Sequence, residues 1–121
     1  MHYLRDWVAP LRELRRVLRD AGVVVFSTHH PMADMDLSTS GDYFATELLH
    51  DRWTKAEKTF EVSFWRRPLS AMFKAIAEAG FRVDSLAEPR PLDECRDRFP
   101  DDWKRLTTEP QFLFFRLVPA S

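Results

Sequence analysis

Residues 22–31, Gly-Val-Val-Val-Phe-Ser-Thr-His-His-Pro, decide the fold class of this chain of 121 residues. Residues 23–26 form a continuous apolar run, which is typical of a strand covered on both faces in an α/β sheet. The glycine before the run suits the end of a helix, and the His-His-Pro sequence after it ends the strand. The stretch therefore predicts an α/β fold with an interior strand at this position.

Helical patterns lie on both sides of this stretch. Upstream, residues 6–21 repeat an apolar side chain every three or four positions, with Asp6 as the expected N-cap. Downstream, Pro68 suits the first position of a second helix, and Gly80 suits its C-terminal cap. These two helices are expected to cover the sheet.

Two more strands follow in the sequence. Residues 81–87 alternate loosely, which favours the edge of a sheet, whereas residues 112–118 are apolar except for Arg116, which favours its centre. Between them, residues 92–110 are expected to hold one or two short helices. The sequence thus predicts a small three-stranded sheet with helices.

Periodicity breaks down in residues 32–65, which contain many loop-forming residues and six aromatic ones. We expect a loop-rich lid insertion, with a short helix within residues 43–53 and a short strand at residues 59–65. A segment with so little regular pattern is predicted to be mobile and to exchange its amide hydrogens quickly.

Composition excludes several classes of protein. The 18 basic and 19 acidic residues give a net charge of -1, so no global field attracts nucleic acid or a membrane surface. The single cysteine, Cys95, forms no intrachain disulfide, no secretory leader opens the sequence, and no apolar run approaches the roughly 20 residues of a membrane span. A cytoplasmic location is therefore expected.

Several segments of the sequence match one family when they are taken together. They are His2-Tyr3-Leu4, Asp6-Trp7, Leu11-Arg12-Glu13-Leu14-Arg15-Arg16-Val17-Leu18, residues 19–31, Phe64-Trp65-Arg66-Arg67-Pro68-Leu69, Ala77-Glu78-Ala79-Gly80-Phe81, Glu88-Pro89-Arg90-Pro91 and residues 112–118. These segments resemble the C-terminal half of class I S-adenosylmethionine-dependent methyltransferases, a Rossmann-like transferase family, and particularly enzymes similar to the ubiquinone and menaquinone biosynthesis methyltransferases.

The resemblance implies that residues 1–121 form a single partial methyltransferase domain with a lid insertion at about residues 32–65. Its three strands would be the family's fifth, seventh and sixth, in a mixed sheet that leaves residues 23–26 at an open edge. The family's Gly-rich cofactor loop has no counterpart, because Gly22, Gly41 and Gly80 stand apart. The chain thus resembles a fragment, a split gene product or a misplaced start, with weak or no binding of S-adenosylmethionine alone.

Two adjacent histidines are the candidate catalytic bases for methyl transfer. His29 and His30 follow the apolar strand, and successive strand residues point to opposite faces, so at most one faces an acceptor. We expect that residue to be His30, next to Pro31. The alternative is that both histidines end the strand and bond to the insertion.

Further site residues come from the resemblance and from aromatic content. His2 and Tyr3 resemble residues near the cofactor's sulfonium, and the candidate residues for binding the substrate are Tyr43, Phe44, Trp65 and Arg67. Core packing accounts equally well for part of this aromatic set.

Other site types fit the sequence less well. His29, His30, Asp34, Asp36 and His50 match no metal-ligand spacing, so no metal is expected. The Arg-rich face of residues 6–21 is interleaved with acidic residues, and we interpret it as solvated rather than as a nucleic-acid site.

Two functions follow. The first is transfer of a methyl group to a small molecule by a chain that supplies the acceptor-side half and is inactive alone. The alternative is a non-catalytic assembly module that forms a homodimer or joins a complementary N-terminal half.

Overall fold

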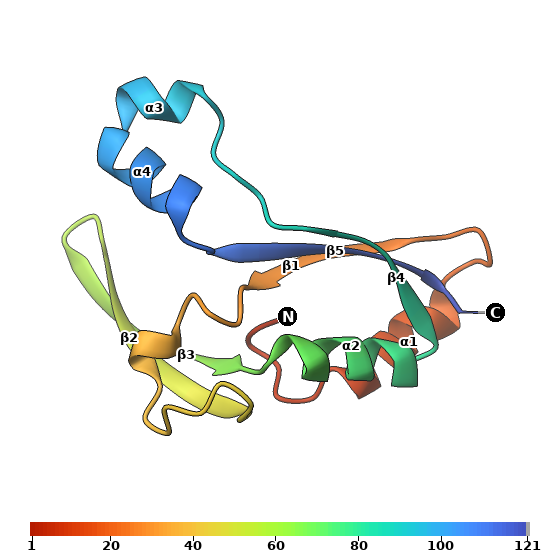
Figure 1. The fold of residues 1–121 in the computed structure, drawn as a ribbon. Helices are drawn as coiled ribbons and strands as arrows, with labels where there is room; N and C mark the ends of the chain where they lie inside the picture. Colours follow the sequence, from red (N-terminus) through yellow and green to blue (C-terminus); the bar gives the residue numbers. More distant parts are fainter. Residues whose placement is uncertain (121) are drawn as a thin grey trace.

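The computed structural model describes residues 1–120 and has the α/β architecture expected from the sequence (Figure 1). Its elements in chain order are α1 (Val8–Val17), β1 (Val24–His29), the 3-10 helix η1 (Met35–Leu37), β2 (Glu47–Lys55), β3 (Lys58–Arg66), α2 (Leu69–Glu78), β4 (Phe81–Ala87), α3 (Glu94–Arg98), α4 (Pro100–Thr108) and β5 (Phe112–Pro119).

Three strands form the main sheet in the order β1-β5-β4. The last strand, β5, lies in the centre as predicted, and β4 lies at an edge as predicted. β5 runs antiparallel to both neighbours, so the expected mixed sheet is wrong for the described residues, whose pairings in this sheet are all antiparallel. The reason is geometric: β1 and β4 run in the same direction but never meet, because β5 separates them.

Helices α1 and α2 lie side by side on one face of the sheet and enclose the core with it (Figure 1). Side chains alternate along β5, so every second residue is buried against the helices. The core consists of Trp7, Leu11, Met72, Ile76, Ala79, Phe81, Leu113, Phe115 and Leu117.

The prediction that residues 23–26 are covered on both faces is wrong. β1 lies at the edge of the sheet, and its burial alternates along the strand. Val24 and Phe26 pack against the core, whereas Val25 is 66% exposed. Among the described residues, the second face is open along most of β1 and is covered only at its end, where Phe64 of β3 contacts His29, which explains why the apolar run is buried on one side only.

The helix ends follow local chemistry. The carboxylate of Asp6 accepts hydrogen bonds from the backbone N–H groups of Val8 and Ala9 at 2.9 and 3.4 Å, which satisfies two free donors of the first turn of α1. Gly80 follows the C-cap of α2 with φ of +90°, a conformation that glycine adopts without strain. α1 is shorter than the predicted span of residues 6–21.

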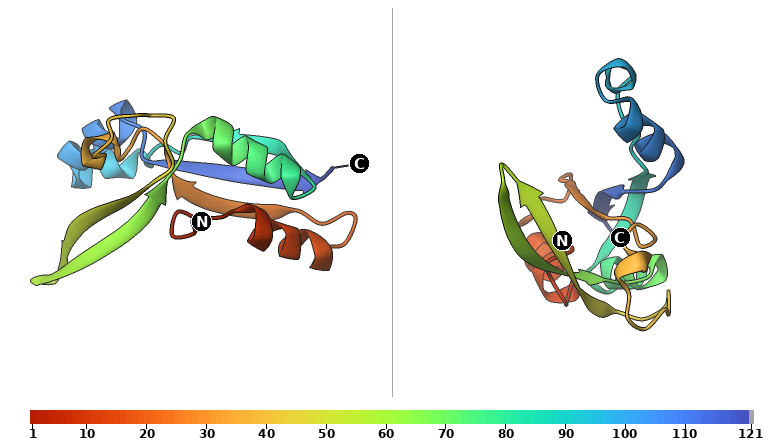
Figure 2. Two further views of the ribbon diagram at one scale, coloured as in Figure 1. Left: turned by 90° about the horizontal axis from the view of Figure 1, so that it is seen from below. Right: turned by 90° about the vertical axis from the view of Figure 1, so that its left-hand side faces the viewer.

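The expected short helix within residues 43–53 is also wrong. β2 and β3 form a long antiparallel hairpin that extends away from the main sheet (Figure 2). The predicted strand at residues 59–65 is confirmed as part of β3. The hairpin turn at Ala56 and Glu57 has φ of 50° and 65°, and it lacks the Asn-Gly sequence that usually marks such a turn. That missing signal is why the sequence did not predict the hairpin.

Replacing Ala56 by Asn and Glu57 by Gly is expected to raise the free energy of unfolding by about 1 kcal/mol. Both positions have positive φ, which alanine and glutamate adopt at a cost and which Asn and Gly tolerate. Urea unfolding of the double variant measures the gain. An unchanged or lower unfolding midpoint would contradict this account of the turn.

The expected helices within residues 92–110 are confirmed as α3 and α4, which pack on each other and stand away from the sheet (Figures 1 and 2). Leu92 and Phe99 of this unit are 76% and 58% exposed. Within residues 1–120, no helix combines the length and apolarity needed to cross a bilayer.

Candidate functional site

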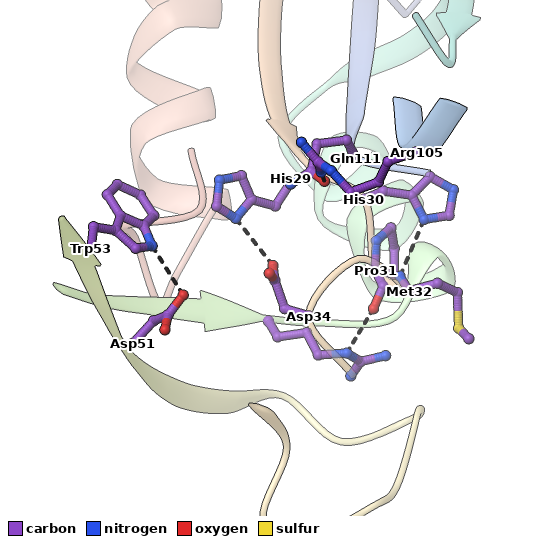
Figure 3. A network of polar contacts seen from close by, with 10 residues as sticks. His29, His30, Pro31, Met32, Asp34, Asp51, Trp53, Arg105 and Gln111 are labelled. Carbon is purple, nitrogen blue, oxygen red and sulfur yellow. Dashed lines mark hydrogen bonds and ion pairs between the residues drawn. The ribbon is translucent and has the colours of Figure 1, made fainter. Parts of the chain in front are cut away.

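The candidate site lies where β1 ends, between the N-terminal residues and residues 32–65, which include β3. His29 and His30 leave this end of β1 in opposite directions, as the alternation of a strand requires (Figure 3). The two rings therefore enter different surroundings, and each is described by its own partners.

The ring of His29 is held by a carboxylate and two aromatic rings. Its Nδ1 lies 3.1 Å from Oδ2 of Asp34, and these two side chains are only 11% and 14% exposed. The rings of Phe64 and Phe112 meet it edge-on at 4.9 and 5.4 Å. In the tautomer that donates its Nδ1 proton to Asp34, the lone pair of the ring lies on Nε2, which has no hydrogen-bond partner among the described residues.

Both ring nitrogens of His30 are occupied. Nδ1 accepts the backbone N–H of Met32 at 3.1 Å, and Nε2 lies 2.8 Å from Oε2 of Glu88. The backbone N–H of His30 also donates to the carbonyl of Gln111 at 3.1 Å. His30 thus ties the end of β1 to the residues that follow β4 and to those that precede β5.

His2 lies directly on His29. The two rings are stacked with centroids 3.8 Å apart, and Phe64 meets the ring of His2 edge-on at 6.1 Å. The Nδ1 of His2 is the one buried side-chain nitrogen or oxygen in residues 1–120 that lacks a hydrogen-bond partner. Burial, followed by the nearby charges of His29 and the N-terminal amine, lowers the pKa of His2 from 6.5 to about 4, while Asp34 acts in the opposite direction.

Tyr3, the second residue expected near a cofactor, lies beside His2 with ring centroids 4.3 Å apart and is 56% exposed. Trp65 donates its backbone N–H to the carbonyl of His2 at 2.6 Å, and the guanidinium of Arg5 lies over its ring. The structure therefore brings His2, Tyr3, His29 and Trp65 together at one end of β1.

Arg67 binds the backbone of the N-terminal residues. Its buried guanidinium donates to the carbonyl oxygens of Leu4 and Arg5 and lies over the ring of Trp7 at 4.7 Å. Burial lowers its pKa to about 10, so the side chain is still charged at neutral pH. The guanidinium of Arg67, a candidate for binding the substrate, is therefore bonded to the backbone of its own chain in this structure.

The remaining two candidates for binding the substrate lie in the loop before β2. The hydroxyl of Tyr43 accepts the backbone N–H of Leu69 at 3.2 Å, and Phe44 meets the ring of Tyr43 at 5.1 Å and is 76% exposed. Tyr43 therefore links the insertion to the start of α2, whereas Phe44 presents its ring to solvent.

Sequence reasoning missed two residues that organise this region. Asp34 orients His29, and the signal for it was a carboxylate five positions after a histidine that ends a strand. Arg66 is 3% exposed and donates to the carbonyls of Pro31, Tyr43 and Ala45 at 2.8, 2.8 and 3.1 Å. No local pattern marks such a residue, because its partners lie 21 to 35 positions away.

The space at the end of β1 is small. The cavity lined by Thr28, His29, Asp34 and Arg67 among others has a volume of about 10 Å³, whereas pockets for cofactors measure roughly 300–1,000 Å³. The larger hollows are open, and lie on the β2–β3 hairpin and beside α3. The space beside His29 is therefore too small for S-adenosylmethionine, and residues 1–120 contain no group of three potential metal ligands.

Comparison with known proteins identifies the fold. No protein-family model and no curated protein matches the sequence. Among solved structures, a protein from Listeria monocytogenes described as a candidate S-adenosylmethionine-dependent methyltransferase has a TM-score of 0.77 and 19% identity. An S-adenosylmethionine-dependent methyltransferase from Mesorhizobium loti has a TM-score of 0.69 and 18% identity.

These likenesses extend over nearly all of the chain. They cover 99% and 96% of it, and 58% and 56% of the two solved chains, respectively. The chain thus spans somewhat more than half the length of the structures it resembles. At these identities the comparison shows an α/β methyltransferase fold, which agrees with the fold class expected from the sequence.

Proposed function

We propose that the chain supplies the acceptor-side half of a class I S-adenosylmethionine-dependent methyltransferase of the ubiquinone and menaquinone type. In this proposal β1, β5 and β4 correspond to the fifth, seventh and sixth strands of the family, and residues 32–65 form a lid over a small-molecule acceptor. The observation that carries it is the fold, which two methyltransferase structures share over nearly the whole chain. A cytoplasmic location belongs to the same proposal.

Within this half, the geometry favours His29 over His30 as the base. A general base needs a free lone pair within reach of the acceptor's proton. His30 uses both ring nitrogens in hydrogen bonds to Met32 and Glu88. His29 is oriented by Asp34 through Nδ1 and leaves Nε2 available, so this residue would accept the proton while Asp34 stabilises the charged ring.

The chain alone is proposed to be inactive. A cavity of about 10 Å³ beside the histidines leaves no room for the cofactor, so the groups that hold its ribose and methionine parts would come from a second polypeptide segment. His2 and Tyr3 would line the junction between this segment and the acceptor side.

A chimera tests this proposal. The part of the Listeria monocytogenes protein that this chain does not match would be joined to the N-terminus of the chain, and binding of S-adenosylmethionine would be measured by calorimetry. We expect micromolar binding by the folded chimera and none by the chain alone. Micromolar binding by the chain alone, or no binding by a folded chimera, would refute the proposal.

The role of His29 is tested in the same chimera with a panel of phenolic and carbon-acid acceptors. His29→Gln is expected to slow release of S-adenosylhomocysteine about 100-fold, the lower end of the usual effect of removing a general base. His30→Gln serves as the matched control and should have a much smaller effect. Equal losses in both variants would place the base elsewhere.

A second candidate function is assembly, and the uncovered face of the main sheet favours it. β1 is an edge strand with unpaired backbone groups along one side. Val25, Phe112 and Phe114 expose 66%, 39% and 43% of their surface on the face opposite α1 and α2. A homodimer that pairs β1 with its symmetry mate, or a complementary N-terminal half, would cover this edge.

Val25→Lys is expected to weaken such a homodimer about tenfold or more, because it places a charge on the exposed edge. Sedimentation at micromolar concentrations measures the effect. Leu92→Lys is the matched control, because Leu92 is 76% exposed beside α3, in the helical unit that stands away from the sheet. A monomeric unmodified chain at these concentrations would contradict the dimer.

A further inference from the structure

We propose that the N-terminal segment, residues 1–6, is a pH-sensitive strap that closes over His29 while His2 is neutral and opens when His2 gains a proton. An open strap would give an acceptor access to His29, the base in the proposed function, and only this consequence rests on the proposed function. The strap itself can be measured without cofactor or acceptor.

The strap is attached at several points whose strength does not change with mild acid. Trp65 donates its backbone N–H to the carbonyl of His2, and Trp7 donates its indole N–H to the carbonyl of Met1 at 3.0 Å. Arg67 donates to the carbonyls of Leu4 and Arg5. The strap is therefore held by neutral or permanently charged donors, apart from the contact of His2.

The contact of His2 is the one that responds to pH. Its ring lies flat on the ring of His29, with an interplanar angle of 17° and centroids 3.8 Å apart. A proton on Nδ1 of His2 would have no acceptor, because this atom is buried and without a partner in the described residues. Burial of the ring also disfavours a positive charge on it.

Charged groups around the stack give the direction of the response. His29 on β1 and the N-terminal amine on the strap disfavour a charge on His2, and Asp34 after β1 favours it but already faces Nδ1 of His29. The packed partners from the other elements are the uncharged rings of Phe64 on β3 and Phe112 at the start of β5. Repulsion and burial therefore outweigh attraction, and the closed strap binds protons less readily than the open one.

The size of the effect follows from linkage. His2 has a pKa of about 4 in the closed strap and 6.5 in the open one, so it destabilises the closed state as the pH falls from about 6.5 to 4. Between pH 7 and pH 5 these two values favour opening by about 20-fold. Well below pH 4 both states carry the proton, and the equilibrium changes no further.

Hydrogen exchange of the Trp65 amide tests the strap, because this N–H bonds to the carbonyl of His2 at 2.6 Å. In the unmodified chain, with any tag placed at its C-terminus, the protection factor of Trp65 is expected to fall about 20-fold between pH 7 and pH 5. The amides of β5 report global opening, and their protection should fall much less. His2→Phe keeps an aromatic ring on His29 without a titrating nitrogen, so its Trp65 protection should not depend on pH.

Constant protection of Trp65 in the unmodified chain, or an equal fall in His2→Phe, would overturn the proposal. If His2→Phe does not fold, NMR titration of the His2 ring protons in the unmodified chain decides the question. A pKa near 4 supports the strap, and a pKa at or above 6.5 refutes it. Neither result depends on methyl transfer, so failure of the strap and failure of the proposed function are distinguishable.

Discussion

Replacing Arg66 by leucine is expected to lower the free energy of unfolding by about 3 kcal/mol or more. The guanidinium of Arg66 donates to the backbone carbonyls of Pro31, Tyr43 and Ala45, which lie near the two ends of the segment between β1 and β2, and its side chain is buried. Leucine leaves all three oxygens without this donor, at roughly 1 kcal/mol or more each. It also removes the cation–π contact between Arg66 and Tyr43 at 4.8 Å. Urea unfolding followed by tryptophan fluorescence measures the loss.

Two further variants separate this explanation from a general effect of removing charge. Arg66→Lys keeps the charge but cannot reach three carbonyls at once, so it should recover only part of the stability. Arg52→Leu removes an arginine whose side chain is 71% exposed and forms an ion pair with the exposed Glu61, and its effect should lie within about 0.5 kcal/mol. Equal losses for Arg66→Leu and Arg52→Leu would contradict the role of the buried network.

Phe115→Ala is expected to lower the free energy of unfolding by about 3–5 kcal/mol, because it opens a cavity at the centre of the core. Phe115 is 0% exposed, stacks on Phe26 at 5.2 Å and meets Trp7 and Phe73 edge-on at 6.4 and 5.9 Å. One substitution thus removes contacts with β1, with α2 and with the residue that precedes α1. The loss is measured by urea unfolding, as for Arg66.

The neighbouring residue gives a matched control of the same chemistry. Phe114 lies on the opposite face of the same strand and is 43% exposed, so Phe114→Ala should cost about 1 kcal/mol or less. A large loss in Phe114→Ala would mean that the second face of the sheet is covered in solution. That result would favour the assembly module over a chain with an open face.

Local chemistry accounts for the elements that the sequence predicted well. β4 and β5 have bounds that agree within a residue with the predicted strands, and the two ends of α2 lie within a residue of the positions that Pro68 and Gly80 indicate. Fixed backbone angles at proline and positive φ at glycine act within one or two residues, so a single sequence expresses them. The hairpin of β2 and β3 lacked such a signal, because its turn uses Ala56 and Glu57 in a conformation that favours other residues.

The candidate site illustrates the opposite situation. Position in the sequence identified His29 and His30 as a pair, and the preference for His30 rested only on the neighbouring Pro31. Their difference comes from partners on other elements: Glu88 lies 58 positions from His30, and His2 stacks on His29 from the N-terminal segment. Which nitrogen of a histidine is free depends on the hydrogen bond that the other nitrogen makes, and that bond exists only in the folded chain.

The sequence by itself determined the α/β class, the central place of β5, the approximate bounds of α2 and the presence of histidines at the end of β1. Those features depend on side-chain periodicity and backbone preference, which act over a few residues. The tertiary structure alone decided that β1 is covered on one face, that Arg66 and Arg67 bond to distant carbonyls, and that Asp34 and His2 surround His29. These features depend on which surfaces meet after folding, because burial and hydrogen bonding are properties of pairs of segments that lie far apart in the chain.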